Sequence, residues 1–190
     1  MLKSEIRALF KEKRKGLSFL EINRISKEIT KLLLDRFDFK NKLVSIFLPI
    51  EKHKEFDSYP LLSELEKCGA KPIVSKSNFE NGSMTLYKYE NADQLEINSF
   101  GIPEPKHGVT VSESILDFVL VPLLAIDKQG NRVGYGKGFY DKLLAKCNPE
   151  CLFIGIILFD EFIEIDDLNP FDIPLHYCVT PNSIYDFKRQ

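Results

Sequence analysis

A long apolar run that leads into a glycine-rich loop and then a helix is the feature that most constrains the fold of this chain. Residues 118–126 are almost continuously apolar, which is typical of a strand buried on both faces. Four glycines follow within residues 127–138, and residues 139–146 carry apolar side chains at helical spacing. Such a loop lets a ligand approach the backbone closely, and the free N–H groups at the helix start face it. The sequence therefore predicts an anion cradle beside a central strand.

The charged residues of this loop favour a phosphate or a carboxylate as the ligand. Arg132 and Lys137 add positive charge, and Asp141 closes the stretch. The loop is not a P-loop, because Gly138 follows Lys137 where serine or threonine is needed. It is not a dinucleotide fingerprint either, because Phe139 stands where the third glycine belongs. The glycines alone would fit a surface loop equally well, and the three charged residues favour the cradle.

Composition indicates an ordinary globular protein. A length of 190 residues suits a single domain spanning 1–190, with 44% hydrophobic and 28% charged residues. The net charge of −2 gives no reason to expect nucleic acid or a membrane as a partner. No apolar run approaches a membrane span and the start lacks a signal-peptide segment, so we expect a cytoplasmic protein. The four scattered cysteines are then expected to be reduced, and no histidine is given a role.

The rest of the chain alternates helical and strand patterns. Two helices are predicted at the start, over residues 2–15 and again after a capping box from Ser18 to Glu21. A further helix is expected to begin at Asp57 or Ser58. Residues 101–105 look like an irregular connection, and strands are expected over residues 43–48, 71–75, 84–89, 152–158 and 177–180. This order predicts an α/β single domain with a largely parallel central sheet flanked by helices and an N-terminal helical pair.

These residues support a resemblance to a known family. Residues 130–141 read Gly-Asn-Arg-Val-Gly-Tyr-Gly-Lys-Gly-Phe-Tyr-Asp and follow the pattern G-x-R-[LV]-G-x-G-x-G-[YF]-Y-D of the 5-formyltetrahydrofolate cyclo-ligases, also called methenyltetrahydrofolate synthetases. The chain resembles this family from about Lys3 to about Thr180. The supporting elements, in order, are the basic stretch from Lys3 to Arg14, Leu48-Pro49, Glu55-Phe56-Asp57, Gly101-Ile102-Pro103-Glu104-Pro105 and Asp172-Ile173-Pro174-Leu175.

The resemblance implies an ATP-dependent ring closure. Such enzymes use MgATP to convert 5-formyltetrahydrofolate into 5,10-methenyltetrahydrofolate, releasing ADP and phosphate. Phosphorylation of the formyl oxygen makes the formyl carbon electrophilic and the oxygen a good leaving group, and N10 then attacks. ATP and 5-formyltetrahydrofolate are therefore the expected partners of a cytoplasmic monomer, with Mg²⁺ as the cofactor and with no nucleic acid or membrane partner.

The resemblance also implies site residues. Catalysis would fall to Lys137 and Arg132, and Mg²⁺ to Asp141 and Asp172. Folate would contact Glu55, an aliphatic residue near Ile50, and the loop residues Tyr135, Gly136, Lys137, Gly138 and Phe139. ATP would contact Lys3, Arg7, Arg132, Val133, Gly134, Tyr135, Gly136, Lys137, Gly138, Phe139 and Tyr140.

Several of these positions have a second interpretation. Two extra residues between Leu48 and Glu55 leave open whether Leu48 or Ile50 takes the aliphatic role, and Glu51 competes with Glu55. Lys3 and Arg7 also fit a solvated helix face. Asp172 also fits a turn before a strand, and Asp141 a helix cap. Tyrosine and phenylalanine outside the glycine loop are expected in the core.

Two other functions compete with the ligase. One is a folate- or nucleotide-binding protein without turnover, although every charged residue that the chemistry needs is present. The other is a different phosphotransferase on a similar scaffold, since a fold does not determine a function. Glu55 and residues 101–105 speak against the second alternative, because a generic kinase has no need of them.

Overall fold

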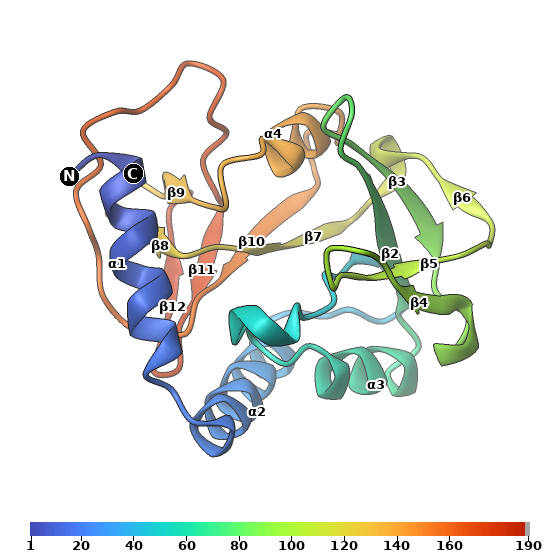
Figure 1. Ribbon diagram of the computed structural model, residues 1–190. Helices are drawn as coiled ribbons and strands as arrows, with labels where there is room; N and C mark the ends of the chain where they lie inside the picture. Colours follow the sequence, from blue (N-terminus) through green and yellow to red (C-terminus); the bar gives the residue numbers. More distant parts are fainter. Residues whose placement is uncertain (189–190) are drawn as a thin grey trace.

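An eight-stranded sheet forms the centre of the computed structural model, which describes residues 1–188 (Figure 1). Residues 189 and 190, the end of the predicted domain, lie outside the described residues. The strand order is β12-β11-β10-β7-β1-β2-β3-β6. The strands are β1 (Leu43–Ser45), β2 (Lys71–Asn78), β3 (Ser83–Lys88), β6 (Thr110–Val111), β7 (Phe118–Pro122), β10 (Leu152–Ile156), β11 (Tyr177–Val179) and β12 (Ile184–Asp186).

The sheet is parallel from β11 to β2, and β12, β3 and β6 are antiparallel at its edges. The prediction of a largely parallel sheet is therefore confirmed. Strand β12 was not predicted, and the expected strand over residues 43–48 pairs only as far as Ser45. Parallel strands need covered faces, which is why the central strands are apolar on both sides.

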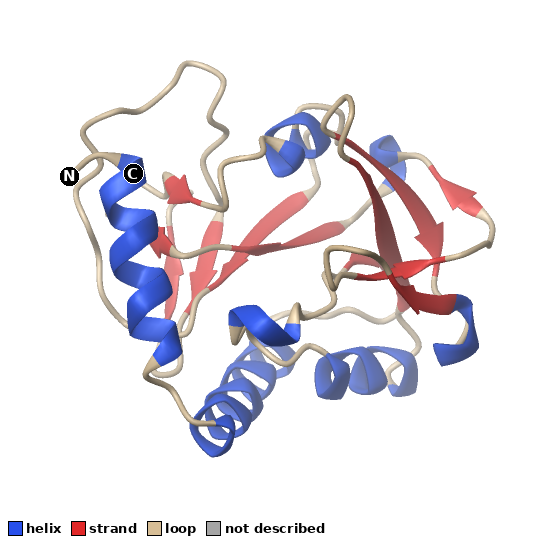
Figure 2. Ribbon diagram, viewed as in Figure 1, coloured by secondary structure: helices blue, strands red, loops and turns tan. Residues whose placement is uncertain are grey.

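Helices cover both faces of the sheet (Figure 2). Along β7, Phe118 and Leu120 pack in the cluster under α2 (Phe19–Arg36) and α3 (Tyr59–Lys67). Their neighbours Val119 and Val121 point to the opposite face, toward α4 (Phe139–Leu144). This alternation follows from the two-residue period of a strand. Short 3₁₀ helices occupy η1 (Glu51–His53), η2 (Ala92–Gln94) and η3 (Glu113–Ile115).

The two N-terminal helices are present, but they belong to different hydrophobic clusters. Helix α1 (Lys3–Lys15) ends at Gly16, and the Ser18 hydroxyl accepts the Glu21 N–H in the predicted capping box of α2. The apolar side of α1 packs against β8 (Ala125–Ile126) and β9 (Arg132–Val133) and not against the large sheet. Its basic residues are thereby placed beside the glycine loop.

The predicted strand over 118–126 is wrong in its second half. Strand β7 ends at Pro122, and β8 pairs antiparallel with β9 as a separate two-stranded ribbon. The turn between them is closed by the buried Asp127 carboxylate, whose Oδ1 accepts the N–H groups of Gln129 at 2.9 Å and Asn131 at 2.8 Å. The continuous apolar run hid this break because the residues on both sides of the half-buried Pro122 are buried.

Two further local predictions are corrected. Residues 101–105 are not wholly irregular, because β5 (Pro103–Pro105) pairs with β4 (Leu95–Ile97). Helix α3 begins after Ser58, but the Ser58 hydroxyl donates to the Phe47 carbonyl and caps nothing. The Asp57 carboxylate accepts the Tyr59 N–H instead, at 3.2 Å. None of the helices within residues 1–188 has the length and apolar character that a bilayer crossing requires.

Candidate functional site

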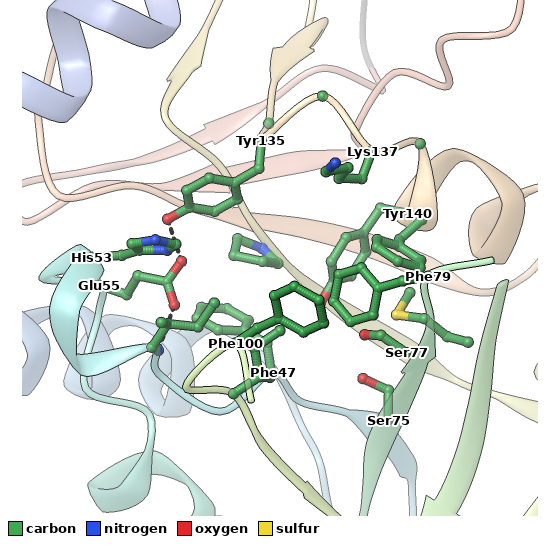
Figure 3. Close-up of a pocket in the computed structure, with 18 of the residues that line it drawn as sticks. Phe47, His53, Glu55, Ser75, Ser77, Phe79, Phe100, Tyr135, Lys137 and Tyr140 are labelled. Carbon is green, nitrogen blue, oxygen red and sulfur yellow. Dashed lines mark hydrogen bonds between the residues drawn. The ribbon is translucent and has the colours of Figure 1, made fainter. Parts of the chain in front are cut away.

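One pocket of about 450 Å³ lies at the carboxyl ends of the central strands (Figure 3). This is the edge at which open α/β sheets usually bind ligands. Fourteen of the fifteen predicted site residues line it, and they are Lys3, Arg7, Ile50, Glu55, Arg132, Gly134, Tyr135, Gly136, Lys137, Gly138, Phe139, Tyr140, Asp141 and Asp172. Val133 does not line it, because its side chain is fully buried in the cluster under α1.

The glycine loop of the pocket is shorter than the sequence predicts and consists of residues 134–138. Gly136 has a φ of 86°, and a Cβ there would lie 3.0 Å from the Arg7 guanidinium carbon. Arg7 is fixed against the loop because its Nε donates to the Gly134 carbonyl at 2.9 Å. Gly130 is not part of the cradle, since it closes the turn between β8 and β9.

Two of the predicted ATP cations are paired with the two predicted metal ligands. Arg132 Nη2 lies 2.6 Å from Asp141 Oδ1, and the Lys3 ammonium donates to Asp172 Oδ2. Asp141 is not a helix cap, because Gly138 occupies the N-cap of α4 and the Asp141 carboxylate accepts from Arg132 and from the Ile173 N–H.

Asp172 takes part in a turn, as its second interpretation predicts, whereas its role as a metal ligand stays a prediction. Its Oδ2 accepts the Asn169 N–H at 2.7 Å within a turn, and the same oxygen accepts from Lys3. Burial raises the pKa of Asp172, but the hydrogen bonds from Lys3 and Asn169 outweigh it and the pKa is lowered. Lys3 is therefore not a solvated helix cation, and its partner comes from the far end of the chain.

Lys137 differs from these cations because it has no hydrogen bond or ion pair with any of residues 1–188. It is exposed on the loop between Gly136 and Gly138, and its side chain lines the pocket (Figure 3). A cation without a protein partner beside a glycine loop is available to an incoming anion.

The carboxylates of the pocket fit a magnesium ion that arrives with a phosphate. Asp141 Oδ2 and Asp172 Oδ1 accept no hydrogen bond from residues 1–188 and remain available. No group of three or more acidic, histidine or cysteine side chains that could hold a metal occurs in the same part of the chain. Mg²⁺ commonly takes only one or two carboxylates and completes its shell with phosphate oxygens and water.

Glu55 lies in the pocket wall beside Ile50 and Tyr135. It is 5% exposed; its Oε2 accepts the Ile50 N–H at 2.7 Å and its Oε1 accepts the Tyr135 hydroxyl proton (Figure 3). Burial raises the pKa of Glu55, and these hydrogen bonds act in the opposite direction. Glu51 is exposed at the start of η1 and does not line the pocket, whereas Leu48 and Ile50 both do.

The sequence did not predict an aromatic cluster that lies at the pocket. Phe79 and Phe100 are 39% and 50% exposed, and their ring centroids lie 4.3 Å apart. Phe139 meets Phe79 edge-on with centroids at 5.3 Å. The expectation that such residues belong to the core is therefore wrong for Phe79 and Phe100. Their position beside turns, before Asn81-Gly82 and before Gly101, is the signal that could have found them.

His53 also lines the pocket, although no role was predicted for it. Its ring stacks on Tyr135 with centroids 5.2 Å apart and an interplanar angle of 24°. Burial lowers the pKa of His53, and repulsion from Lys52 and Lys11 lowers it further. The neutral imidazole therefore acts as a flat support for the Tyr135 ring.

Comparison with known proteins points to one family. The 5-formyltetrahydrofolate cyclo-ligase family matches residues 1–181. The protein of that name from Escherichia coli (strain K12) is 30% identical over 154 residues, which cover 76% of this chain and 80% of the relative. The mouse protein of the same name is 28% identical over 153 residues, with 76% and 74% covered.

Solved structures agree with these relatives. The 5,10-methenyltetrahydrofolate synthetase of Aquifex aeolicus superposes with a TM-score of 0.82 at 33% identity, covering 99% of this chain and 94% of its own. The synthetase of Mycoplasma pneumoniae superposes with a TM-score of 0.73 at 21% identity, covering 94% and 98%, and so shows the shared fold alone.

Proposed function

The chain belongs to the 5-formyltetrahydrofolate cyclo-ligase family, and from this premise we propose how its pocket carries out the reaction. The enzyme is a ligase that forms a C–N bond and converts 5-formyltetrahydrofolate into 5,10-methenyltetrahydrofolate. We infer that ATP drives the ring closure and that ADP and phosphate are released.

The proposed reaction has two steps. The formyl oxygen attacks the γ-phosphorus of ATP, the bond to ADP breaks, and the formyl carbon becomes the centre of an iminium phosphate. N10 then attacks that carbon, loses its proton to the departing phosphate or to water, and the C–O bond breaks as phosphate leaves. Phosphoryl transfer of this kind depends on positioning and charge neutralisation, with little covalent help from the protein.

The phosphate end of the pocket supplies that neutralisation. The N–H groups of residues 134–138 and the free ammonium of Lys137 would bind the transferring phosphate, with Arg7, Lys3 and Arg132 around it. Asp141 and Asp172 would hold Mg²⁺, which would neutralise part of the negative charge of the ATP phosphates. The pairs of Arg132 with Asp141 and of Lys3 with Asp172 keep cations and carboxylates together at this end.

The folate end of the pocket supplies recognition. Glu55 has acceptor capacity left after its two protein hydrogen bonds and would accept N–H groups of the pterin. Leu48, Ile50 and the exposed rings of Phe79 and Phe100 give flat apolar walls for the aromatic parts of the folate.

One observation carries the proposal: Glu55, the Lys137 loop and the two aspartates open onto a single pocket. A substrate that must meet ATP at its formyl oxygen requires such an arrangement. The test is ATP hydrolysis measured with and without 5-formyltetrahydrofolate, together with the near-ultraviolet absorbance of the methenyl product. We expect ADP and methenyl product to appear in equal amounts and both to vanish in excess chelator.

The other outcomes would identify the competing functions. A rate of ATP hydrolysis that does not depend on 5-formyltetrahydrofolate would indicate a different phosphotransferase. Tight folate binding without ADP formation would indicate a binding protein. Full turnover in excess chelator would remove Asp141 and Asp172 from a metal role.

A further inference from the structure

Arg14 is a buried cation that no part of the proposed reaction uses. It lies in the last turn of α1, is 4% exposed and does not line the pocket. Its Nη1 donates to the Tyr135 hydroxyl oxygen at 2.6 Å, and its Nη2 donates to the Leu123 carbonyl, also at 2.6 Å. A buried charge is costly unless it is paired and hydrogen-bonded, and the two Nη groups of Arg14 meet this need through partners that include the pocket residue Tyr135.

The hydrogen bonds from Arg14 run in one direction. A guanidinium only donates, so the Tyr135 oxygen is the acceptor of that bond. The single hydroxyl proton of Tyr135 is then directed to Glu55 Oε1, while Glu55 Oε2 accepts the Ile50 N–H. Both oxygens of Glu55 therefore accept a hydrogen bond in this Arg14–Tyr135–Glu55 network, which suits an ionised carboxylate.

The position of Arg14 adds charge to the same arrangement. Its Nη1 lies 3.9 Å from Glu55 Oε1, and both side chains are almost fully buried. Attraction at such a distance is strong where water is excluded. Arg14 therefore both directs the Tyr135 proton and neutralises the carboxylate.

Other titratable groups lie near Tyr135 and Glu55, but none of them makes the hydrogen bonds that Arg14 makes. From α1, the Lys11 ammonium lies 5.9 Å above the Tyr135 ring. From η1, His53 stacks on the same ring in its neutral form. From α4, the half-buried Tyr140 has its pKa raised by desolvation and then by the charge of Glu55. None of these side chains donates a hydrogen bond to Glu55 or to the Tyr135 oxygen. Arg14 is thus the cation directly linked to the carboxylate.

We propose that Arg14 is a positioning residue that, through the Tyr135 hydroxyl, orients the Glu55 carboxylate and keeps it ionised as the acceptor for folate. The inference about folate rests on the proposed role of Glu55, whereas the link from Arg14 to Glu55 does not. Burial raises the pKa of Glu55 and Arg14 opposes this rise. Loss of the Arg14 hydrogen bonds should therefore raise that pKa further, so that folate binding fails at a higher pH as the pH is lowered.

Carbon-13 NMR of protein labelled at the glutamate carboxyl carbons reads the pKa of Glu55 directly, and Glu55→Gln identifies its resonance. Arg14→Lys keeps a charge but loses the two-pronged donor, and we expect it to raise the pKa of Glu55 by about one unit. The dissociation constant of 5-formyltetrahydrofolate, measured by calorimetry without ATP, should equal the wild-type value at a pH well above both Glu55 pKa values. It should approach a rise of about tenfold over wild type as the pH falls below the wild-type pKa of Glu55. Arg24→Lys, at an exposed arginine on α2, is the matched control and should change neither quantity.

A double-variant cycle separates positioning from a general loss of structure. Tyr135→Phe removes the hydroxyl, and Arg14→Lys should then add less to the Glu55 pKa than it does in the wild type. An unchanged Glu55 pKa in a folded Arg14→Lys protein overturns the inference, and so does an unchanged pKa in Tyr135→Phe if the Arg14 variant does not fold. If the wild type binds no folate but Arg14→Lys still raises the pKa of Glu55, the inference about Arg14 stands and the proposed function is overturned.

Discussion

Arg132 and Asp141 form an ion pair that closes the glycine loop at its two ends. Arg132 belongs to β9 and Asp141 to the first turn of α4, and the side chains meet at 2.6 Å with Arg132 only 6% exposed. The loop of residues 134–138 is therefore anchored at both ends while its middle stays open to the pocket. Such a loop is preorganised to receive an anion, because the backbone does not have to be ordered on binding.

The first prediction concerns Asp141→Asn. The amide keeps an oxygen acceptor for Arg132 but loses the charge that would hold Mg²⁺. We expect a higher Mg²⁺ concentration for half-maximal turnover, a lower kcat and a cost in stability of about 1–3 kcal/mol. Mg²⁺ titration at fixed ATP measures the effect, with Asp35→Asn on α2 as the control. Coincident titration curves for wild type and Asp141→Asn would contradict the metal role.

Lys137→Met should separate turnover from folding. The side chain is exposed and unpaired within residues 1–188, so its loss should leave the Tm unchanged. Removal of a preorganised charge at a transition state typically lowers kcat by ~10²-fold or more. Steady-state kinetics and thermal unfolding test the two statements, and Lys31→Met on α2 is the exposed control. A kcat equal to that of the wild type would remove Lys137 from catalysis.

Glu55→Gln should weaken folate binding and leave ATP binding nearly intact. The loss of a charged acceptor is expected to cost about 1–3 kcal/mol in the free energy of folate binding. Glu51→Gln is the matched control, because Glu51 is exposed and lies outside the pocket lining. Calorimetry with each ligand measures both affinities. A larger effect from the Glu51 variant would show that Glu51, and not Glu55, is the carboxylate that binds folate.

Phe100→Ala tests the aromatic wall. Phe100 is 50% exposed and contacts Phe79 with tilted rings, so its removal should cost little stability. We expect the KM for 5-formyltetrahydrofolate to rise by an amount equivalent to about 0.5–1.5 kcal/mol, with little change in the KM for ATP. Phe19→Ala on α2, at a phenylalanine that is 65% exposed, serves as the control. Equal folate KM values for wild type and Phe100→Ala would remove this ring from the folate wall.

The last prediction is a pH dependence of stability. The pKa of Asp172 is below its ordinary value of 3.8, since the hydrogen bonds from Lys3 and Asn169 outweigh burial. A lowered pKa stabilises the fold above 3.8, and this contribution is lost as the pH falls through the folded-state pKa. The Tm difference between wild type and Asp172→Asn should thus be largest at neutral pH and shrink in acid. In a Lys3→Met background the same substitution should have a smaller effect, and additive effects would contradict the pairing.

The sequence by itself determined the elements whose signals are local. Continuous apolar runs identify β7 and β10, the capping box places the start of α2, and the glycine pattern locates the loop before α4. Each of these features depends on neighbours a few residues apart, because strand and helix periods and turn chemistry act over that range. The resemblance added the identity of the site residues, which pattern alone left open.

Only the tertiary structure decided how distant residues meet. A helical period shows that one side of α1 is buried, but it does not show that this side covers the ribbon of β8 and β9 or that Arg14 reaches Tyr135. The pairing of Lys3 with Asp172 and the exposure of Phe100 at the pocket are likewise set by packing between elements far apart in the chain. The physical reason is that a hydrophobic pattern states which surface leaves water, since burial is non-directional, whereas the partner of that surface is chosen by the whole fold.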